Sequence, residues 1–272
     1  MISFAVLMAE VVSLSALDLV LASILIPALG GLTLVLQLGV TRQVLVAATR
    51  TVVQLLLVGL ILKWLFEEAH PGWLLPIAFL MVSLAGYEVM RRQKHRFRGG
   101  WGWGIGTVSM LVSSFTLTLF VLIAVIGAEP WYRPQYAIPL LGMTLGNTMN
   151  GIALGLNHLN SFVWDRREAV EGQLMLGRTW SESVTQIRRD SLRTGLIPIV
   201  NSMAVAGLIS LPGMMTGQIL AGSPPLEAVK YQILIMFLVA SGTGFGTLAA
   251  VWLGSRRLFD ERQRLRLDRL RQ

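Results

Sequence analysis

The sequence contains no cysteine, which excludes a disulfide framework, a thiolate metal site and a cysteine nucleophile. Charge is also scarce: 14% of the 272 residues are Asp, Glu, Lys or Arg, whereas 54% are hydrophobic. Soluble domains carry about 25% charged residues, so this composition indicates a chain that lies in lipid. The three histidines, His70, His95 and His158, are spread along the chain, so no histidine ligand cluster is visible.

Signature motifs of several protein classes are missing as well. The chain has no G-x-x-x-x-G-K-[ST] phosphate loop, no G-x-S-x-G and no H-E-x-x-H, so we do not expect an enzyme. Glycine triplets at 102–106 and 242–246 open or lie within apolar stretches, which favours close helix packing over nucleotide binding. No Asp or Glu lies in the middle of a predicted span, and Asp18 and Glu88 lie at span ends. Ion-driven carriers typically have acids within their spans, so such a carrier is disfavoured. Uphill transport would therefore need energy from another protein.

What the sequence does contain is long apolar runs. A bilayer core of about 30 Å needs about 20 apolar residues in a helix. Candidate spans are Leu19–Leu38, Thr51–Phe66, Trp73–Met90, Gly102–Ala128, Tyr136–Leu156, Gly195–Leu220 and Tyr231–Gly254. The sequence thus predicts an all-α, polytopic membrane helix bundle of about seven transmembrane helices, in the cell inner (plasma) membrane. Residues 1–17 lack a basic start, so we expect an interfacial helix or an extension of the first span, not a signal peptide.

The net charge of +8 comes from basic blocks between the spans. Segments 39–50, 91–98, 159–194 and 255–272 hold 2, 5, 6 and 7 Lys and Arg, which is 20 of the 23. The positive-inside rule makes these segments internal, with the N-terminus outside and the C-terminus inside. Basic residues beside apolar spans suit membrane lipid headgroups, and no nucleic-acid partner is expected. The prediction is one permease domain over 1–272, with cytosolic helices at about 159–194 and a basic cytosolic tail at 255–272.

Amides and thioethers gather in the fifth and sixth predicted spans. Amides are costly in hydrocarbon unless they are paired or face a cavity. Together, amide oxygens and the softer thioether sulfurs could serve as ligands along a route. The alternatives are methionine as a packing filler and close helix packing at the two G-M-x-x-G phrases, 142–146 and 213–217. The hypothesis is a substrate pathway, and no metal ligand is assigned. Its residues are Met143, Asn147, Asn150, Asn201, Met214, Met215 and Gln218.

These phrases resemble a known family. Gly142-Met143-x-x-Gly146-Asn147-x-Met149 is similar to a segment of the FetB-type iron-export ABC transporter permeases, which are related to plant aluminium-tolerance ABC permeases. Further similar segments are Glu171-x-x-Leu174-x-x-Gly177, the run 207–217, and Thr49-Arg50-x-x-x-Gln54-Leu55-x-x-x-Gly59. The resemblance covers most of residues 49–250.

The resemblance implies the permease subunit of an ATP-driven transporter that exports a metal ion, iron. The partners it implies are a cytosolic ABC ATPase subunit, which would bind ATP and Mg, and a second copy of this chain; this chain itself would bind no cofactor. Glu171, Gly177 and Ile187 keep the spacing of an ABC-importer coupling phrase, although Arg189-Asp190 replace its final Leu-Pro. These three residues are therefore predicted to couple the permease to the ATPase.

Other functions stay open on the sequence. A passive channel or a secondary carrier for a small solute is one, and a membrane scaffold without cargo is another. A membrane-embedded enzyme is the third, without a catalytic constellation to support it. The charged segment 159–194 would be a plain solvated connector in such proteins and a docking element in an ABC permease.

Overall fold

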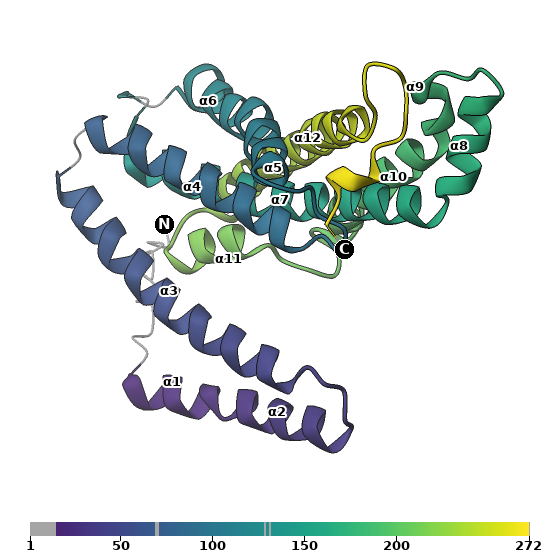
Figure 1. Cartoon of the computed structure of the whole chain (residues 1–272). Helices are drawn as coiled ribbons and strands as arrows, with labels where there is room; N and C mark the ends of the chain where they lie inside the picture. The colour runs from purple at the N-terminus through teal and green to yellow at the C-terminus, as the bar shows by residue number, and fades with distance from the viewer. Residues whose placement is uncertain (1–14, 69–70, 128, 131, 272) are drawn as a thin grey trace, which may run out of the picture. The chain divides into compact units, whose positions relative to one another are not determined.

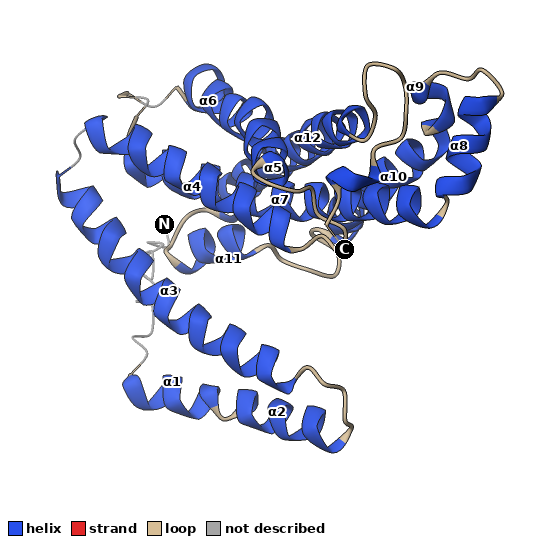
Figure 2. Ribbon diagram, in the orientation of Figure 1, coloured by secondary structure: helices blue, strands red, loops and turns tan. Residues whose placement is uncertain are grey.

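The computed structural model describes residues 15–68, 71–127, 129–130 and 132–271, and these ranges are helical with three isolated bridges in place of strands (Figure 2). The prediction for the N-terminal apolar segment concerns residues 1–17, of which 1–14 lie outside the described residues, whereas Ala16 and Leu17 begin the first helix. The chain divides into two compact units (Figure 1). One comprises 1–70 with 218–223, and the other comprises 71–217 with 224–272.

The first unit contains α1 (Ala16–Ser23), α2 (Leu25–Val35) and α3 (Thr41–Glu68). The hydroxyls of Thr33 and Thr41 lie 2.8 Å apart and join α2 to the start of α3. Most apolar side chains of α3 are exposed, as expected of a helix that faces lipid. The helix begins at Thr41 and not at Thr51, so the second span is longer than predicted and Arg50 lies within it.

The second unit holds the remaining helices, except that α11 crosses into the first unit at Gln218. α5 continues through π-helical turns at Leu111–Phe115 and Val121–Ile126, with α6 between them. The helices are α4 (Pro71–Arg91), α5 (Trp101–Met110), α6 (Thr116–Phe120), α7 (Pro134–Asp165), α8 (Arg167–Met175), α9 (Trp180–Ser183), α10 (Thr185–Val205), α11 (Gly213–Leu220) and α12 (Pro225–Arg257).

Five helical stretches of the described chain are long and apolar enough to cross a membrane. They are Leu17–Val35, Thr41–Phe66, Gly72–Arg91, Trp101–Ile126 and Pro225–Arg257. These match the first four and the last of the predicted spans. The predicted fifth span lies within α7, which is continuous. The predicted sixth span is interrupted, because α10 ends at Val205 and α11 begins only at Gly213.

Close helix packing in the second unit centres on α7, which packs against α12, α10 and α4. A Cβ at Gly246 would lie 2.6 Å from Thr148 Cγ2, and one at Gly106 would lie 3.1 Å from the Gly86 carbonyl oxygen. These contacts confirm close packing for the two glycine triplets. At Gly146, Gly213 and Gly217, by contrast, an added Cβ would meet no atom within 4 Å, and at Gly142 it would meet only the Met81 methyl group at 3.5 Å. Close packing within this chain therefore does not explain the glycines of the G-M-x-x-G phrases.

Three segments predicted to be internal meet at one end of the second unit. Lys94 N donates to Asn157 Oδ1 over 2.8 Å, and Asn160 Nδ2 donates to the His95 carbonyl over 2.8 Å. Trp180 N donates to Gln263 Oε1 over 3.0 Å. The loop after α4, the α7–α10 region and the C-terminal tail therefore lie on the same side of the helices.

Candidate functional site

A cavity of about 290 Å³ lies among α7, α10, α12 and the segment that leads into α11. The break in the predicted sixth span contributes to it, because Ser210 and residues 212–214 line the cavity. Its lining residues are Met143, Asn147, Ile199, Ser202, Ser210, Pro212, Gly213, Met214, Gln232, Ile235, Met236 and Val239.

Three of the predicted pathway residues line this cavity: Met143, Asn147 and Met214. Met143 and Asn147 share one face of α7, as their spacing of four residues predicts. The Asn147 amide donates from Nδ2 to the Met143 carbonyl over 2.9 Å. This hydrogen bond uses the Nδ2 group and anchors the amide. The other end of the amide, Oδ1, stays available as an acceptor.

The other four predicted residues do not line the cavity. Asn150 accepts a hydrogen bond from the Arg92 guanidinium and so holds the loop after α4. Asn201 is exposed, and Met215 is half-buried beside Met214. Gln218 belongs to the first unit, and its buried Oε1 has no hydrogen-bond partner among the described residues.

Gln232, Met236 and Ser210 also line the cavity, although the sequence did not single them out for a pathway. Gln232 is buried in α12, and its Oε1 has no hydrogen-bond partner within the described ranges. An amide inside an apolar span was the signal that identified Asn147, and the same signal would have identified Gln232. Ser210 could not be found in this way, because its position depends on the break between α10 and α11.

The cavity lining mixes polar and apolar side chains and contains no ionisable one. Its possible ligands are the amide oxygens of Asn147 and Gln232, hydroxyl groups and the thioethers of three methionines. Within the described ranges, no three His, Cys, Asp or Glu side chains gather closely enough to hold a metal ion. Neutral ligands bind a cation weakly, which suits passage through a site and not long-term storage.

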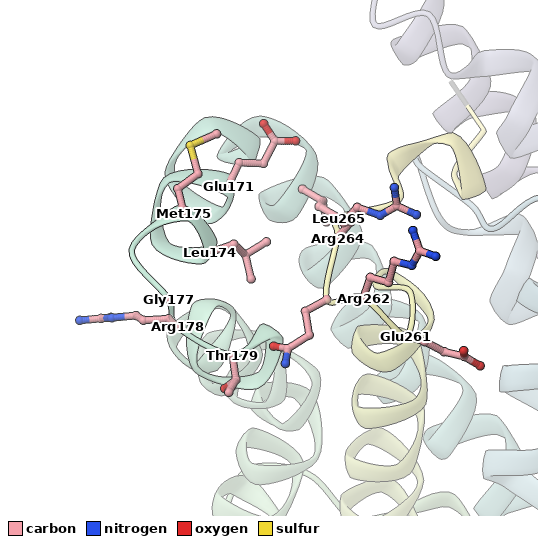
Figure 3. A pocket seen from close by; sticks show the side chains of 11 residues that line it. Glu171, Leu174, Met175, Gly177, Arg178, Thr179, Glu261, Arg262, Arg264 and Leu265 are labelled. Atoms are coloured by element: carbon pink, nitrogen blue, oxygen red, sulfur yellow. The ribbon is translucent and has the colours of Figure 1, made fainter.

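A second hollow, of about 640 Å³, lies between the α8–α9 turn and residues 261–265 of the tail (Figure 3). Two predicted coupling residues, Glu171 and Gly177, line it, whereas Ile187 is buried in the core of the unit. Leu174 points into the hollow and Arg178 points away from it (Figure 3). The hollow is called the cytosolic groove below, after the predicted side of its two walls.

Gly177 ends α8 with a φ of +84°, a left-handed conformation that L side chains rarely adopt. Its N–H donates to the Leu174 carbonyl over 3.0 Å, and Arg178 N donates to the Gln173 carbonyl over 3.2 Å. A Cβ added at Gly177 would meet no atom within 4 Å. Within this chain the glycine therefore makes no close helix contact, and it turns the backbone after α8.

The rim and far wall of the cytosolic groove have opposite character. Met175 and Leu176, at the tip of α8, are 85% and 84% exposed and form an apolar rim. Hydrogen bonds to Asp260 hold the far wall: its carboxylate accepts from the backbone N–H of Arg264 and from the Arg264 guanidinium. The backbone hydrogen bond from Arg264 contributes most to holding the pKa of Asp260 below its usual range, and the guanidinium lowers it further.

Comparison with known proteins shows what the chain is similar to. The profile of the Uncharacterised protein family UPF0014 matches residues 16–259. The chain is 39% identical to the UPF0014 membrane protein slr1647 of Synechocystis sp., over 84% of this chain and 87% of that protein. It is 32% identical to the "Probable iron export permease protein FetB" of Escherichia coli, over 86% of this chain and 88% of that protein.

A plant relative is the "Protein ALUMINUM SENSITIVE 3" of Arabidopsis thaliana, 30% identical over 79% of this chain and 77% of that protein. No solved structure matches the chain. The family match, together with the apolar helices, shows a multi-pass membrane protein. The chain belongs to the UPF0014 family of membrane proteins.

Proposed function

We propose that this chain is the membrane-spanning permease subunit of an ATP-driven ABC transporter that exports a metal ion. The observation that carries the proposal is the uncharged cavity among α7, α10 and α12, in which two amides and two hydroxyls lie among thioethers and aliphatic side chains. Its amide and thioether groups form a route for a cation inside helices whose other faces suit lipid. Met143, Asn147, Met214 and Gln232 are the residues that we assign to this route.

The proposal includes seven spans, with the N-terminus outside and the C-terminus inside, and a homodimer. Support for the orientation comes from the hydrogen bonds that join the loop after α4, the α7–α10 region and the tail at one end of the second unit. These three segments carry most of the Lys and Arg, so the positive-inside rule assigns that end to the cytosol. α7 and the pair α10–α11 supply the two spans beyond the five apolar stretches.

Energy would come from a separate cytosolic ABC ATPase, to which ATP and Mg bind. The cytosolic groove supports this part of the proposal, because its apolar rim at Met175 and Leu176 is exposed at the predicted cytosolic end. α10 begins six residues after Thr179, which lines the groove, and Ile199 and Ser202 near its far end line the cavity. Pressure on the groove would therefore reach the cavity along one helix.

Iron is proposed as cargo because the Escherichia coli relative is named an iron-export permease. The cavity would accept the ion through amide and hydroxyl oxygens, which hard cations prefer, with thioethers as a softer supplement. Without a carboxylate in its lining, the cavity would release the ion readily. This property fits a transport route that is driven by an external energy source.

The experiment is reconstitution of the permease with its copurified ABC ATPase in sealed vesicles, followed by measurement of ATP-dependent iron transport. The double variant Asn147→Leu/Gln232→Leu should lose transport while staying inserted and folded, because leucine suits an apolar environment. Asn201→Leu is the matched control, since Asn201 is an exposed amide outside the cavity. Normal transport by the double variant would reject the cavity as the route, and ATP-independent transport would reject the ABC assignment.

A further inference from the structure

Two short segments, each with an apolar residue between two arginines, form a backbone bridge at the predicted cytosolic end. Arg96-Phe97-Arg98 and Arg269-Leu270-Arg271 form an antiparallel bridge between Phe97 and Leu270. Arg98 N donates to the Arg269 carbonyl over 2.8 Å, and Arg271 N donates to the Arg96 carbonyl over 2.7 Å. Successive side chains of extended backbone point to opposite faces. The two apolar side chains are buried, whereas Arg98 and Arg271 are exposed and Arg96 is half-buried. Arg269 differs from them, because its guanidinium donates to the carbonyls of Arg257 and Phe259.

Three of these arginines line a hollow of about 570 Å³: Arg96, Arg98 and Arg271. Its other lining residues are Met90, Phe97 and Gly99. The lining thus contains three cations and no acid. Among the described residues, none of the three guanidinium groups has an ion pair or a side-chain hydrogen bond, whereas Arg264 and Arg266 nearby pair with Asp260 and Asp268. The hollow, called the arginine pocket below, therefore presents uncompensated positive charge.

The arginine pocket lies where two spans meet water. Met90 is in the last turn of α4, and Gly99 lies two residues before Trp101, the first residue of α5. Both helices are long and apolar enough to cross a membrane, and only residues 92–100 join them. Trp101 and Trp103 are exposed at this end of α5, and tryptophan prefers the headgroup level of a bilayer. The pocket is therefore placed at the depth of lipid headgroups.

We propose that the arginine pocket binds the phosphate group of an anionic phospholipid. Guanidinium groups hold phosphate oxygens through paired N–H donors, and basic pockets beside transmembrane helices suit lipid headgroups. Met90 would contact the upper part of an acyl chain while the arginines hold the headgroup. The lipid would join the loop after α4 to the tail from outside, where the Phe97–Leu270 pair joins them from inside. The inference is independent of the proposed transport function.

The test uses the whole protein in a zwitterionic detergent and follows its thermal unfolding with added phosphatidylglycerol, phosphatidylcholine or inorganic phosphate. Phosphatidylglycerol should stabilise the protein at far lower concentration than phosphatidylcholine. Arg96→Gln/Arg98→Gln/Arg271→Gln should weaken this lipid's apparent affinity roughly a hundredfold, because each basic residue near an anionic surface contributes about a factor of five. Arg167→Gln/Arg189→Gln/Arg193→Gln removes the same charge from exposed positions elsewhere and should keep the wild-type affinity.

Several outcomes would overturn the proposal. Equal loss in the two triple variants would indicate a general effect of net charge, and equal stabilisation by inorganic phosphate would indicate a free-anion site. If lipid binding is unchanged in the pocket variant but ATPase copurification is lost, the arginines contact a protein partner instead. Should the glutamine variant fail to fold, Arg96→Lys/Arg98→Lys/Arg271→Lys keeps the charge without the paired donors. The affinity of this lysine variant for phosphatidylglycerol should fall below that of the wild type, and a wild-type affinity would reject guanidinium recognition.

Discussion

Phe97 and Leu270 face each other across an antiparallel bridge, and both side chains are almost completely buried. One lies in the loop between the third and fourth predicted spans and the other at the end of the tail. Their contact converts a tail that looks like a solvated basic segment into part of the folded unit. The same tail contributes Arg271 to the arginine pocket and residues 261–265 to the cytosolic groove.

Shortening Leu270 should therefore destabilise the protein. Leu270 is 1% exposed, and Leu270→Ala should cost about 2–3 kcal/mol of unfolding free energy, because it removes buried methyl groups and leaves a cavity. Leu248→Ala is the control, since Leu248 is 55% exposed on α12 and should cost less than about 1 kcal/mol. Thermal unfolding in detergent compares the two. Equal stability of the variants would mean that the tail does not support the fold.

Adding one methyl group at Gly151 should disturb the contact of α7 with α12 and α10. A Cβ there would lie 2.6 Å from Thr243 Cγ2 and 3.0 Å from the Gly195 carbonyl oxygen. We expect Gly151→Ala to destabilise the protein by about 1–3 kcal/mol. Gly146→Ala on the same helix meets no atom within 4 Å and should be neutral or slightly stabilising. A reversed order in the two melting temperatures would contradict this packing.

The turn at Gly177 predicts a graded series. Gly177→Leu forces a branched side chain into the left-handed region, at a cost of roughly 1–2 kcal/mol, so the turn should shift and ATPase stimulation should fall. Asparagine tolerates this conformation better, so Gly177→Asn should keep most of the stimulation. Stimulation is measured on copurified complexes at equal permease content. Full stimulation of the leucine variant would show that the segment only connects α7 to α10.

The apolar rim predicts a loss of binding without a loss of stability. Met175→Gln/Leu176→Gln should weaken ATPase copurification at least about tenfold, because two apolar side chains would no longer be buried on docking. Both side chains are exposed in this chain alone, so the melting temperature of the free permease should not change. Leu226→Gln, an exposed leucine in the first turn of α12, is the matched control. Unchanged copurification would move the docking site away from this rim.

The sequence predicted the helical membrane architecture because runs of apolar residues follow directly from bilayer thickness. It predicted Met143 and Asn147 on one face, since four residues make about one helical turn. It did not predict the bridge between Phe97 and Leu270, because these residues lie far apart along the chain and neither carries a local signal. It did not predict that α10 ends at Val205, and this break brings Ser210 to the cavity. Gln232 carried the same signal as Asn147, an amide inside an apolar span, but was not singled out.

The pairing of the loop with the tail also has a consequence for biosynthesis. The ribosome makes residues 92–98 long before it reaches Leu270, so Phe97 has no partner while most of the second unit is inserted into the membrane. Residues 261–265, which form one wall of the cytosolic groove, are likewise made after every transmembrane segment. A nascent or prematurely terminated chain therefore lacks the completed groove, and only a fully translated chain would recruit an ATPase there.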